Sequence, residues 1–238
     1  CGCGGLSLGF KNAGYVPTIS IDNWEHSLRV YKENFDHTIV QHDLTDENGT
    51  IDLIKEHDAD LIIGGPPCQA YSLAGRSRNL SKKDYSLEGD ERHYLYREYV
   101  RILERLRPAA FVMENVKGVI SSQVDGGGIF QRILSDLSSA GDGYELLPLT
   151  KSRQAERLEG KDFLVHADNH GLPQARHRVF IVGLRRDIPL PLRETPLLPR
   201  SSEVVSVRDA IGDLPALRSG LSCADSTISW NKSVLKEA

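Results

Sequence analysis

A cysteine and a glutamate each follow a short apolar run of the kind that forms a buried strand. Cys68 comes directly after Gly64-Gly65-Pro66-Pro67, past a strand predicted over residues 59–63, and Glu114 ends a second strand predicted over residues 109–113. Two prolines stiffen the backbone and aim the next side chain, and open α/β sheets bind ligands at the carboxyl ends of their strands. If the two strands are neighbours, a thiol nucleophile and an acid face one crevice. When each residue is considered alone, two other interpretations stay open: Cys68 is an inert cysteine, and Glu114 is a solvated carboxylate.

A glycine-rich turn, Cys1-Gly2-Cys3-Gly4-Gly5, precedes a helix-like stretch. Glycines let a backbone approach a ligand closely, and a helix N-terminus favours polar or anionic groups. Asp22 ends the next predicted strand, where an acid can accept hydrogen bonds from ribose hydroxyls. Asp43, past the following strand, is a second candidate contact. A nucleotide-type cofactor site and a plain structural turn both fit this pattern.

Basic residues gather in Gln174-Ala175-Arg176-His177-Arg178, just before an apolar strand. Strand alternation would place Gln174, Arg176 and Arg178 on one face. Two arginines on one face can hold a phosphate or a base carbonyl. A salt-bridged edge strand is the alternative.

The elements that must position these residues are short apolar strands and helical stretches. They alternate along the chain, which is typical of a parallel α/β sheet. Residues 70–92 are polar and predict a long loop. Strands are predicted over residues 16–21, 38–41, 59–63, 109–113, 144–149 and 179–184, and helices over 23–34, 49–56, 93–107, 129–140 and 207–211.

Five segments, in this order, resemble the cytosine-C5 DNA methyltransferase family: Gly2-Cys3-Gly4-Gly5, Asp22-Asn23-Trp24, Gly65-Pro66-Pro67-Cys68-Gln69-Ala70-Tyr71-Ser72, Glu114-Asn115-Val116 and Gln174-Ala175-Arg176-His177-Arg178. The resemblance implies a Rossmann-like α/β fold of the S-adenosylmethionine-dependent methyltransferases, a three-layer sandwich with a mostly parallel sheet. It also implies methyl transfer to C5 of a flipped-out cytosine in double-stranded DNA, in bacterial restriction-modification or as an orphan activity.

The resemblance also implies individual roles. Cys68 is the expected nucleophile, Glu114 the acid that engages N3 and the exocyclic amine, Arg178 the contact to the cytosine carbonyl, and Arg176 its companion. The expected cofactor contacts are Gly2, Cys3, Gly5, Asp22, Asn23, Asp43, Leu44, Gly65, Pro67 and Leu95. Contacts to DNA are expected from Ser72, Arg76 and Arg78 in a loop that closes over the duplex. Asn23 departs from the family, which usually has an adenine-stacking residue there, although Trp24 follows it.

Composition narrows the class of protein. The chain has 238 residues, 39% of them hydrophobic and 26% charged, as is usual for a globular domain. No apolar run approaches the roughly 20 residues of a membrane helix, and no signal peptide is visible, so we expect a cytoplasmic, nucleoid-associated protein. Cys1 and Cys3 lack a second Cys/His pair at ligand spacing, so we expect no metal. The net charge is −4, but basic residues outnumber acidic ones in residues 76–107 and 151–218.

The domain organisation departs from the family. We expect a catalytic and cofactor-binding domain over residues 1–185, without its first strand, and a connection over 186–238 towards an absent target-recognition domain. A complementing segment or subunit would supply what is missing.

Two other functions are alternatives to DNA methylation. One is that of a tRNA cytosine methyltransferase of the same family, and the other is that of a catalytically incomplete DNA-binding subunit. A zinc deaminase needs Pro-Cys-x-x-Cys, which Cys68 does not begin. A Rossmann oxidoreductase has no use for Cys68 beside Glu114.

Overall fold

The computed structural model describes residues 1–67, 95–124, 127–151, 158–189, 197–214 and 226–237. The chain divides into two compact units, and each is described by itself. The first comprises residues 1–166 and 177–199, and the second comprises residues 167–176 and 200–238. The predicted boundary at residue 185 stays a prediction.

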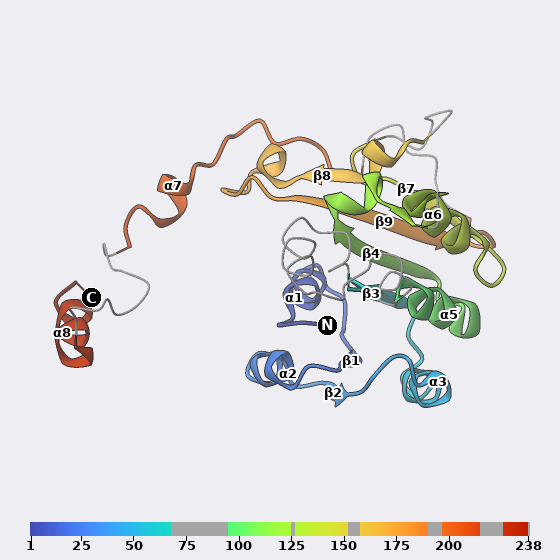
Figure 1. The fold of residues 1–238 in the computed structure, drawn as a ribbon, viewed down its shortest axis with the longest axis horizontal. Coiled ribbons are helices and arrows are strands. Elements are labelled where there is room, and N and C mark those ends of the chain that lie inside the picture. Colours follow the sequence, from blue (N-terminus) through green and yellow to red (C-terminus); the bar gives the residue numbers. More distant parts are fainter. Residues whose placement is uncertain (68–94, 125–126, 152–157, 190–196, 215–225, 238) are drawn as a thin grey trace, which may run out of the picture. The chain divides into compact units, whose positions relative to one another are not determined.

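The main sheet of the first unit has the strand order β3-β4-β9-β7, with β8 also paired to β9 (Figure 1). These strands are β3 (Leu61–Gly64), β4 (Ala110–Val116), β7 (Tyr144–Leu147), β8 (Leu164–His166) and β9 (His177–Arg185). β3 and β4 are parallel, whereas β9 runs antiparallel to β4, β7 and β8. The α/β class is confirmed, and the sheet, expected to be mostly parallel, is mixed, because β9 runs against all three of its neighbours.

A second, two-stranded sheet precedes the main one in the chain. Its parallel strands β1 (Ile19–Asp22) and β2 (Thr38–Gln41) are joined by α2 (Glu25–Lys32). Helix α1 (Gly5–Asn12) comes before β1, and α3 (Glu47–Lys55) follows β2. The carboxyl ends of β1 and β2 therefore lie side by side, because parallel neighbours end at the same edge.

The core of the first unit lies on one face of the main sheet, under α5 (Tyr96–Leu106) and α6 (Ile129–Ser139). The alternating burial of β4 turns Phe111 and Met113 towards these helices. Tyr99 of α5 reaches across two strands, with its hydroxyl 3.0 Å from the Ile62 carbonyl and 3.1 Å from the Val112 carbonyl. Burial raises the pKa of Tyr99 well above its ordinary value, so the hydroxyl stays a donor. Helix α5 thereby ties β3 to β4.

Most predicted elements are confirmed within a few residues. The helix expected over 207–211 is α7 (Val207–Ile211), and the strand expected over 38–41 is β2. The strand expected over 16–21 begins only at Ile19. The sequence patterns missed β8, the short hairpin β5 (Gln123–Val124) and β6 (Gly127–Gly128), and helix α8 (Thr227–Glu237). The predicted loop over 70–92 lies outside the described residues.

The second unit holds α7 and α8 and a 3-10 turn over Ala167–His170. Ser206 caps α7, since its hydroxyl accepts from the Asp209 N–H while the Asp209 carboxylate accepts from the Ser206 N–H. Among the described residues, no helix is long and apolar enough to cross a membrane.

The close packing of β9 on β4 predicts a cost for adding one methyl group. A Cβ at Gly183 would lie 2.0 Å from a ring carbon of Phe111, a ring that is buried in the core. Gly183→Ala should lower the free energy of unfolding by about 1–3 kcal/mol, measured by urea denaturation of the full-length protein. Gly9→Ala, in α1, is the matched control, since a Cβ there meets nothing within 4 Å. Equal stability of the two variants would contradict this packing.

Candidate catalytic and cofactor site

Glu114 lies against the segment that leads to Cys68. The pairing of β3 with β4 sets Gly64 opposite Met113, so Gly65 and Glu114 follow at the same edge. A Cβ at Gly65 would lie 3.1 Å from Glu114 Oε2 and 3.5 Å from the Glu114 carbonyl oxygen. The expectation that the two strands are neighbours is confirmed, and Gly65 makes the close approach of Glu114 possible.

The other neighbour of β4 brings an arginine to the same carboxylate. Arg178 lies opposite Val116 in the antiparallel β4–β9 ladder, and its Nε is 2.9 Å from Glu114 Oε1. Both side chains are about a quarter exposed, at 26% for Arg178 and 24% for Glu114. Arg178 also donates from Nη1 to the His177 carbonyl. The two oxygens of Glu114 thus have different surroundings, since Oε1 faces Arg178 and Oε2 faces Gly65.

The structure does not describe four of the remaining predicted catalytic and DNA-contacting residues, and the fifth belongs to the second unit. Cys68, Ser72, Arg76 and Arg78 lie outside them. Arg176 is exposed and belongs to the second unit. The expected strand alternation of Gln174, Arg176 and Arg178 is wrong, because β9 begins only at His177, where its ladder with β8 begins.

The glycine turn is held against the end of β1 by Asp22. The Gly2 N–H donates to Asp22 Oδ2 at 2.7 Å, and the Trp24 N–H donates to Oδ1 at 3.0 Å. Gly2 and Gly4 have φ angles of 58° and 94°, in the left-handed region that favours glycine. Asp22 therefore fixes the turn as well as presenting a carboxylate at a strand end.

The charge of Asp22 is stabilised where it lies. Partial burial works against the charged form, but the N–H groups of Gly2 and Trp24, together with the amino group of Cys1, outweigh burial and hold the pKa of Asp22 below its ordinary value. Two oxygens carry about four acceptor positions, so an ionised Asp22 with these three donors can accept a further hydrogen bond from a ribose.

Asn23 and Asp43 meet at the neighbouring strand ends. Asp43 accepts hydrogen bonds from the Thr45 N–H at 3.0 Å and the Thr45 hydroxyl at 2.8 Å. These bonds, with a further one from the Asn23 side chain, lower the pKa of Asp43. The carboxylates of Asp22 and Asp43 thus follow adjacent parallel strands, as the sequence predicted.

Arg101 is a residue of this region that the sequence patterns missed. It lies on α5, and it donates from Nη2 to the Leu44 carbonyl at 2.7 Å and from Nη1 to the Glu47 carboxylate at 2.8 Å. Its signal in the sequence is no stronger than that of any arginine on a helix. Arg101 anchors the segment that carries Asp43 and Leu44.

The residues at these strand ends fit a nucleotide-type cofactor. Among the described residues, a Cβ at Gly2 or at Gly5 would meet nothing within 4 Å, so this part of the chain leaves open space over the turn where the backbone can be approached. Asp22 and Asp43 supply acceptors for hydroxyl groups. Of the other expected contacts, Cys3 and Pro67 are exposed, and Leu95 is half-buried before α5.

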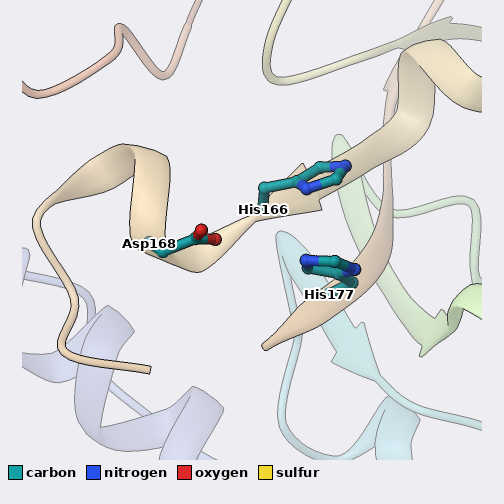
Figure 2. A group of neighbouring side chains, drawn as sticks. All are labelled: His166, Asp168 and His177. Atoms are coloured by element: carbon teal, nitrogen blue, oxygen red, sulfur yellow. The ribbon is translucent and has the colours of Figure 1, made fainter. Parts of the chain in front are cut away.

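Two histidines face each other next to the Glu114–Arg178 pair. His166 of β8 lies opposite His177 of β9, with ring centroids 4.0 Å apart (Figure 2). Asp168, also drawn there, belongs to the second unit. The expected absence of a metal stays a prediction.

Solved structures with the same fold define the class. The chain matches a crystal structure from E. coli, described as that of a DNA modification methyltransferase encoded within a prophage, with a TM-score of 0.68 and 28% identity. The match covers 94% of this chain and 56% of that one. The S. pombe Dnmt2 methyltransferase shares the fold at a TM-score of 0.55 and 15% identity, over 97% of this chain and 62% of that one. The fold is that of the DNA methyltransferases.

Sequence comparison then gives the family. The family model for C-5 cytosine-specific DNA methylase matches residues 1–234, and the chain belongs to this family. It is 34% identical over 212 residues to the type II methyltransferases M.HgiDI of Herpetosiphon aurantiacus and M.HindV of Haemophilus influenzae. Each alignment covers 89% of this chain, and the chain spans 59% and 60% of these relatives.

The double role of Asp22 predicts a pH-dependent cost of removing its charge. Asp22→Asn should lower the free energy of unfolding of the full-length protein by roughly 1–2 kcal/mol at neutral pH, because two N–H groups lose an ionised acceptor. A carboxyl whose pKa is lowered by folding contributes fully above its ordinary value of 3.8, and this contribution is lost as pH falls through the folded pKa.

Urea unfolding at a series of pH values measures this difference, which should shrink as the pH falls towards the folded pKa. Asp52→Asn, an exposed carboxyl on α3, is the control and should change stability by less than about 0.5 kcal/mol. A difference for Asp22→Asn that stays constant down to acid pH would show that its charge does not hold the turn.

Proposed function

We propose that the protein containing this chain is a DNA (cytosine-5)-methyltransferase that acts through a covalent intermediate on Cys68. The observation that carries the proposal is the position of Glu114, which contacts Gly65 on the segment leading to Cys68 and pairs with Arg178 on the other side. Membership of the C-5 cytosine-specific DNA methylase family supports it.

Cys68 supplies the covalent step. C5 of cytosine is a poor nucleophile, and addition of the Cys68 thiolate to C6 gives C5 the character of an enamine carbon. When bound, S-adenosylmethionine supplies the electrophilic methyl group that becomes bonded to C5, with S-adenosylhomocysteine as the leaving group. Loss of the C5 proton to a base and cleavage of the C6–S bond then return the cysteine thiolate and leave 5-methylcytosine in the DNA.

Glu114 and Arg178 stabilise the charge that thiolate addition places on the ring. Glu114 would engage N3 and the exocyclic amine, and Arg178 would donate to the carbonyl oxygen at C2. The ion pair suits this division of roles, since Arg178 holds Glu114 through Oε1 and leaves Oε2 on the side of Gly65. Arg178 thus both orients the acid and contacts the base.

S-adenosylmethionine would bind at the ends of β1 and β2. Gly2, Cys3 and Gly5 would lie against its methionine part and ribose, and Asp22 would accept from the ribose hydroxyls. The adenine would lie near Asn23, Asp43 and Leu44, with Gly65, Pro67 and Leu95 forming the remaining wall. The open space over Gly2 and Gly5 supports this placement.

The substrate would be a cytosine in double-stranded DNA. A stacked base cannot reach a recessed thiol, so the base must leave the helix. Ser72, Arg76 and Arg78 would contact the DNA backbone, and Arg176 would act beside Arg178. The relatives carry the name type II methyltransferase, which supports a role in restriction-modification. In a bacterium, the protein would then methylate DNA in the cytoplasm.

Covalent trapping tests the proposal. The full-length protein should form a denaturation-resistant complex with an oligonucleotide that carries 5-fluorocytosine at the target, because fluorine cannot leave as the C5 proton does. Cys68→Ser should abolish the complex, and Cys223→Ser is the matched cysteine control. Glu114→Gln should slow trapping by roughly 10²-fold or more. Undiminished trapping by Cys68→Ser would remove Cys68 from the mechanism.

We also propose that a further strand completes the sheet between β1 and β3. Among the described residues, β1 pairs with β2 and β3 pairs with β4, which leaves the other edge of β1 and of β3 without a strand. The glycine turn is tied to β1 through Asp22, and the helix that follows it, α1, contacts β3. A strand leading into the turn would therefore lie between the two edges, where it would pair with both.

This proposal predicts that residues 1–238 alone are marginally stable and transfer no methyl group to DNA. A segment that supplies the strand and a target-recognition domain, on the same chain or on a partner subunit, should restore both properties. Methyl incorporation into DNA and amide hydrogen exchange in Ile19–Asp22 and Leu61–Gly64 measure the effect, with exchange slowed in the completed protein. Site-specific methylation by the 238-residue chain at the rate of the completed protein would contradict the proposal that a further strand and a target-recognition domain are required.

A further inference from the structure

Three polar side chains form a closed hydrogen-bonded group beneath the glycine turn. The Ser20 hydroxyl donates to the Tyr31 hydroxyl at 2.6 Å, and Nε2 of His37 lies 2.9 Å from the Ser20 oxygen and 3.3 Å from the Tyr31 oxygen. Ser20 and Tyr31 are buried, and His37 is half-buried. The group joins β1, α2 and the segment that enters β2. We call it the Ser20–Tyr31–His37 triad.

The triad touches the cofactor turn through two aromatic rings. Tyr31 stacks on Phe35 with ring centroids 4.3 Å apart. A Cβ at Gly4 would lie 2.4 Å from Phe35 and 3.1 Å from Tyr31, so the turn rests directly on this pair. His37 meets both rings edge-on, with centroids 5.6 Å from each. A shift of Tyr31 or His37 would therefore move the surface on which Gly4 lies.

The triad and Asp22 hold the turn from the same strand. Ser20 and Asp22 are two residues apart on β1. Because successive side chains of a strand alternate between its faces, these two side chains lie on the same face. Asp22 holds the Gly2 N–H, while Ser20 holds the ring that supports Gly4. Two residues of one strand thus support the turn, one through its backbone and one through the rings beneath it.

We propose that the Ser20–Tyr31–His37 triad positions the glycine turn for cofactor binding, and that a neutral His37 is required for this. The inference rests on the proposed function, because it concerns the same cofactor site. The triad residues are positioning residues, since they act through the turn and do not contact the cofactor themselves.

The charges around His37 favour its neutral form. Burial lowers the pKa of His37 below its ordinary value of 6.5, the positive charge of Lys11 lowers it further, and Asp36 opposes the shift. Lys11 lies in the last turn of α1, with its amino group 5.6 Å from the Phe35 ring centroid. Protonation of His37 would place a second positive charge beside this ring pair. Cofactor affinity should therefore be full above about pH 6.5 and fall as the pH drops through the folded pKa of His37.

Calorimetric titration of the full-length protein with S-adenosylhomocysteine tests this inference. Tyr31→Phe removes the hydroxyl and should raise Kd by about 3- to 10-fold, with KM for S-adenosylmethionine raised similarly and kcat unchanged. His37→Gln keeps a hydrogen-bonding group that cannot titrate. It should bind as the parent does at neutral pH and lose the decline in affinity on acidification.

Tyr144→Phe is the matched control. Tyr144 is also fully buried, and its hydroxyl donates to the Pro108 carbonyl at 2.9 Å, outside the triad. This variant should lose stability like Tyr31→Phe but keep the parent's Kd. Equal Kd for Tyr31→Phe and Tyr144→Phe, or an unchanged acid decline in His37→Gln, would overturn the inference. A parent protein that does not bind S-adenosylhomocysteine would contradict the proposed function itself, and this inference with it.

Discussion

The ion pair between Glu114 and Arg178 depends on the strand arrangement around β4, and the approach of Glu114 to the segment that leads to Cys68 depends on the same arrangement. An acid at the end of a strand needs a fixed partner if it is to hold one orientation. Here β9 supplies that partner from one side, while β3 supplies a glycine on the other. Because β9 runs antiparallel to β4, the start of β9 lies beside the end of β4. A parallel strand there would bring its carboxyl end, and not Arg178, to this edge.

The described part of the site consists of two groups on two sheets. One group, around Glu114, is positioned by the ladders of β4 with β3 and β9. The other, around Asp22, is positioned by hydrogen bonds from backbone N–H groups and by the aromatic rings under Gly4. A carboxylate that accepts hydrogen bonds from backbone N–H groups is stabilised in its charged form. Asp22 accepts from the Gly2 and Trp24 N–H groups and pairs with the amino group of Cys1, whereas Glu114 faces a guanidinium.

The sequence predicted the ends of strands better than their direction. The positions of Asp22 and Glu114 followed from apolar runs that stop at a polar residue. Asp22 does end β1, whereas β4 continues to Val116, two residues past Glu114. The direction of β9 does not follow from such a run, because an apolar strand has the same pattern in either direction, and so the sheet was expected to be mostly parallel. Contacts such as Arg101 to Leu44 and Tyr31 to Gly4 join segments far apart in the chain, and local periodicity carries no sign of them. The role of Cys68 still rests on the family and on the position of Gly65.

The hydroxyl of Tyr99 limits how this part of the sequence can vary. It lies within hydrogen-bonding distance of carbonyls on both β3 and β4, and its ring packs on Gly64, where a Cβ would lie 2.9 Å from a ring carbon. A larger residue at position 64 would need a smaller one at position 99, and a smaller one would remove the hydroxyl that spans the two strands. Position 64 is thus coupled to position 99, because a side chain added at position 64 would displace the Tyr99 ring. Any change at position 64 would therefore disturb the contact by which α5 joins the strand that leads to Cys68 to the strand that carries Glu114.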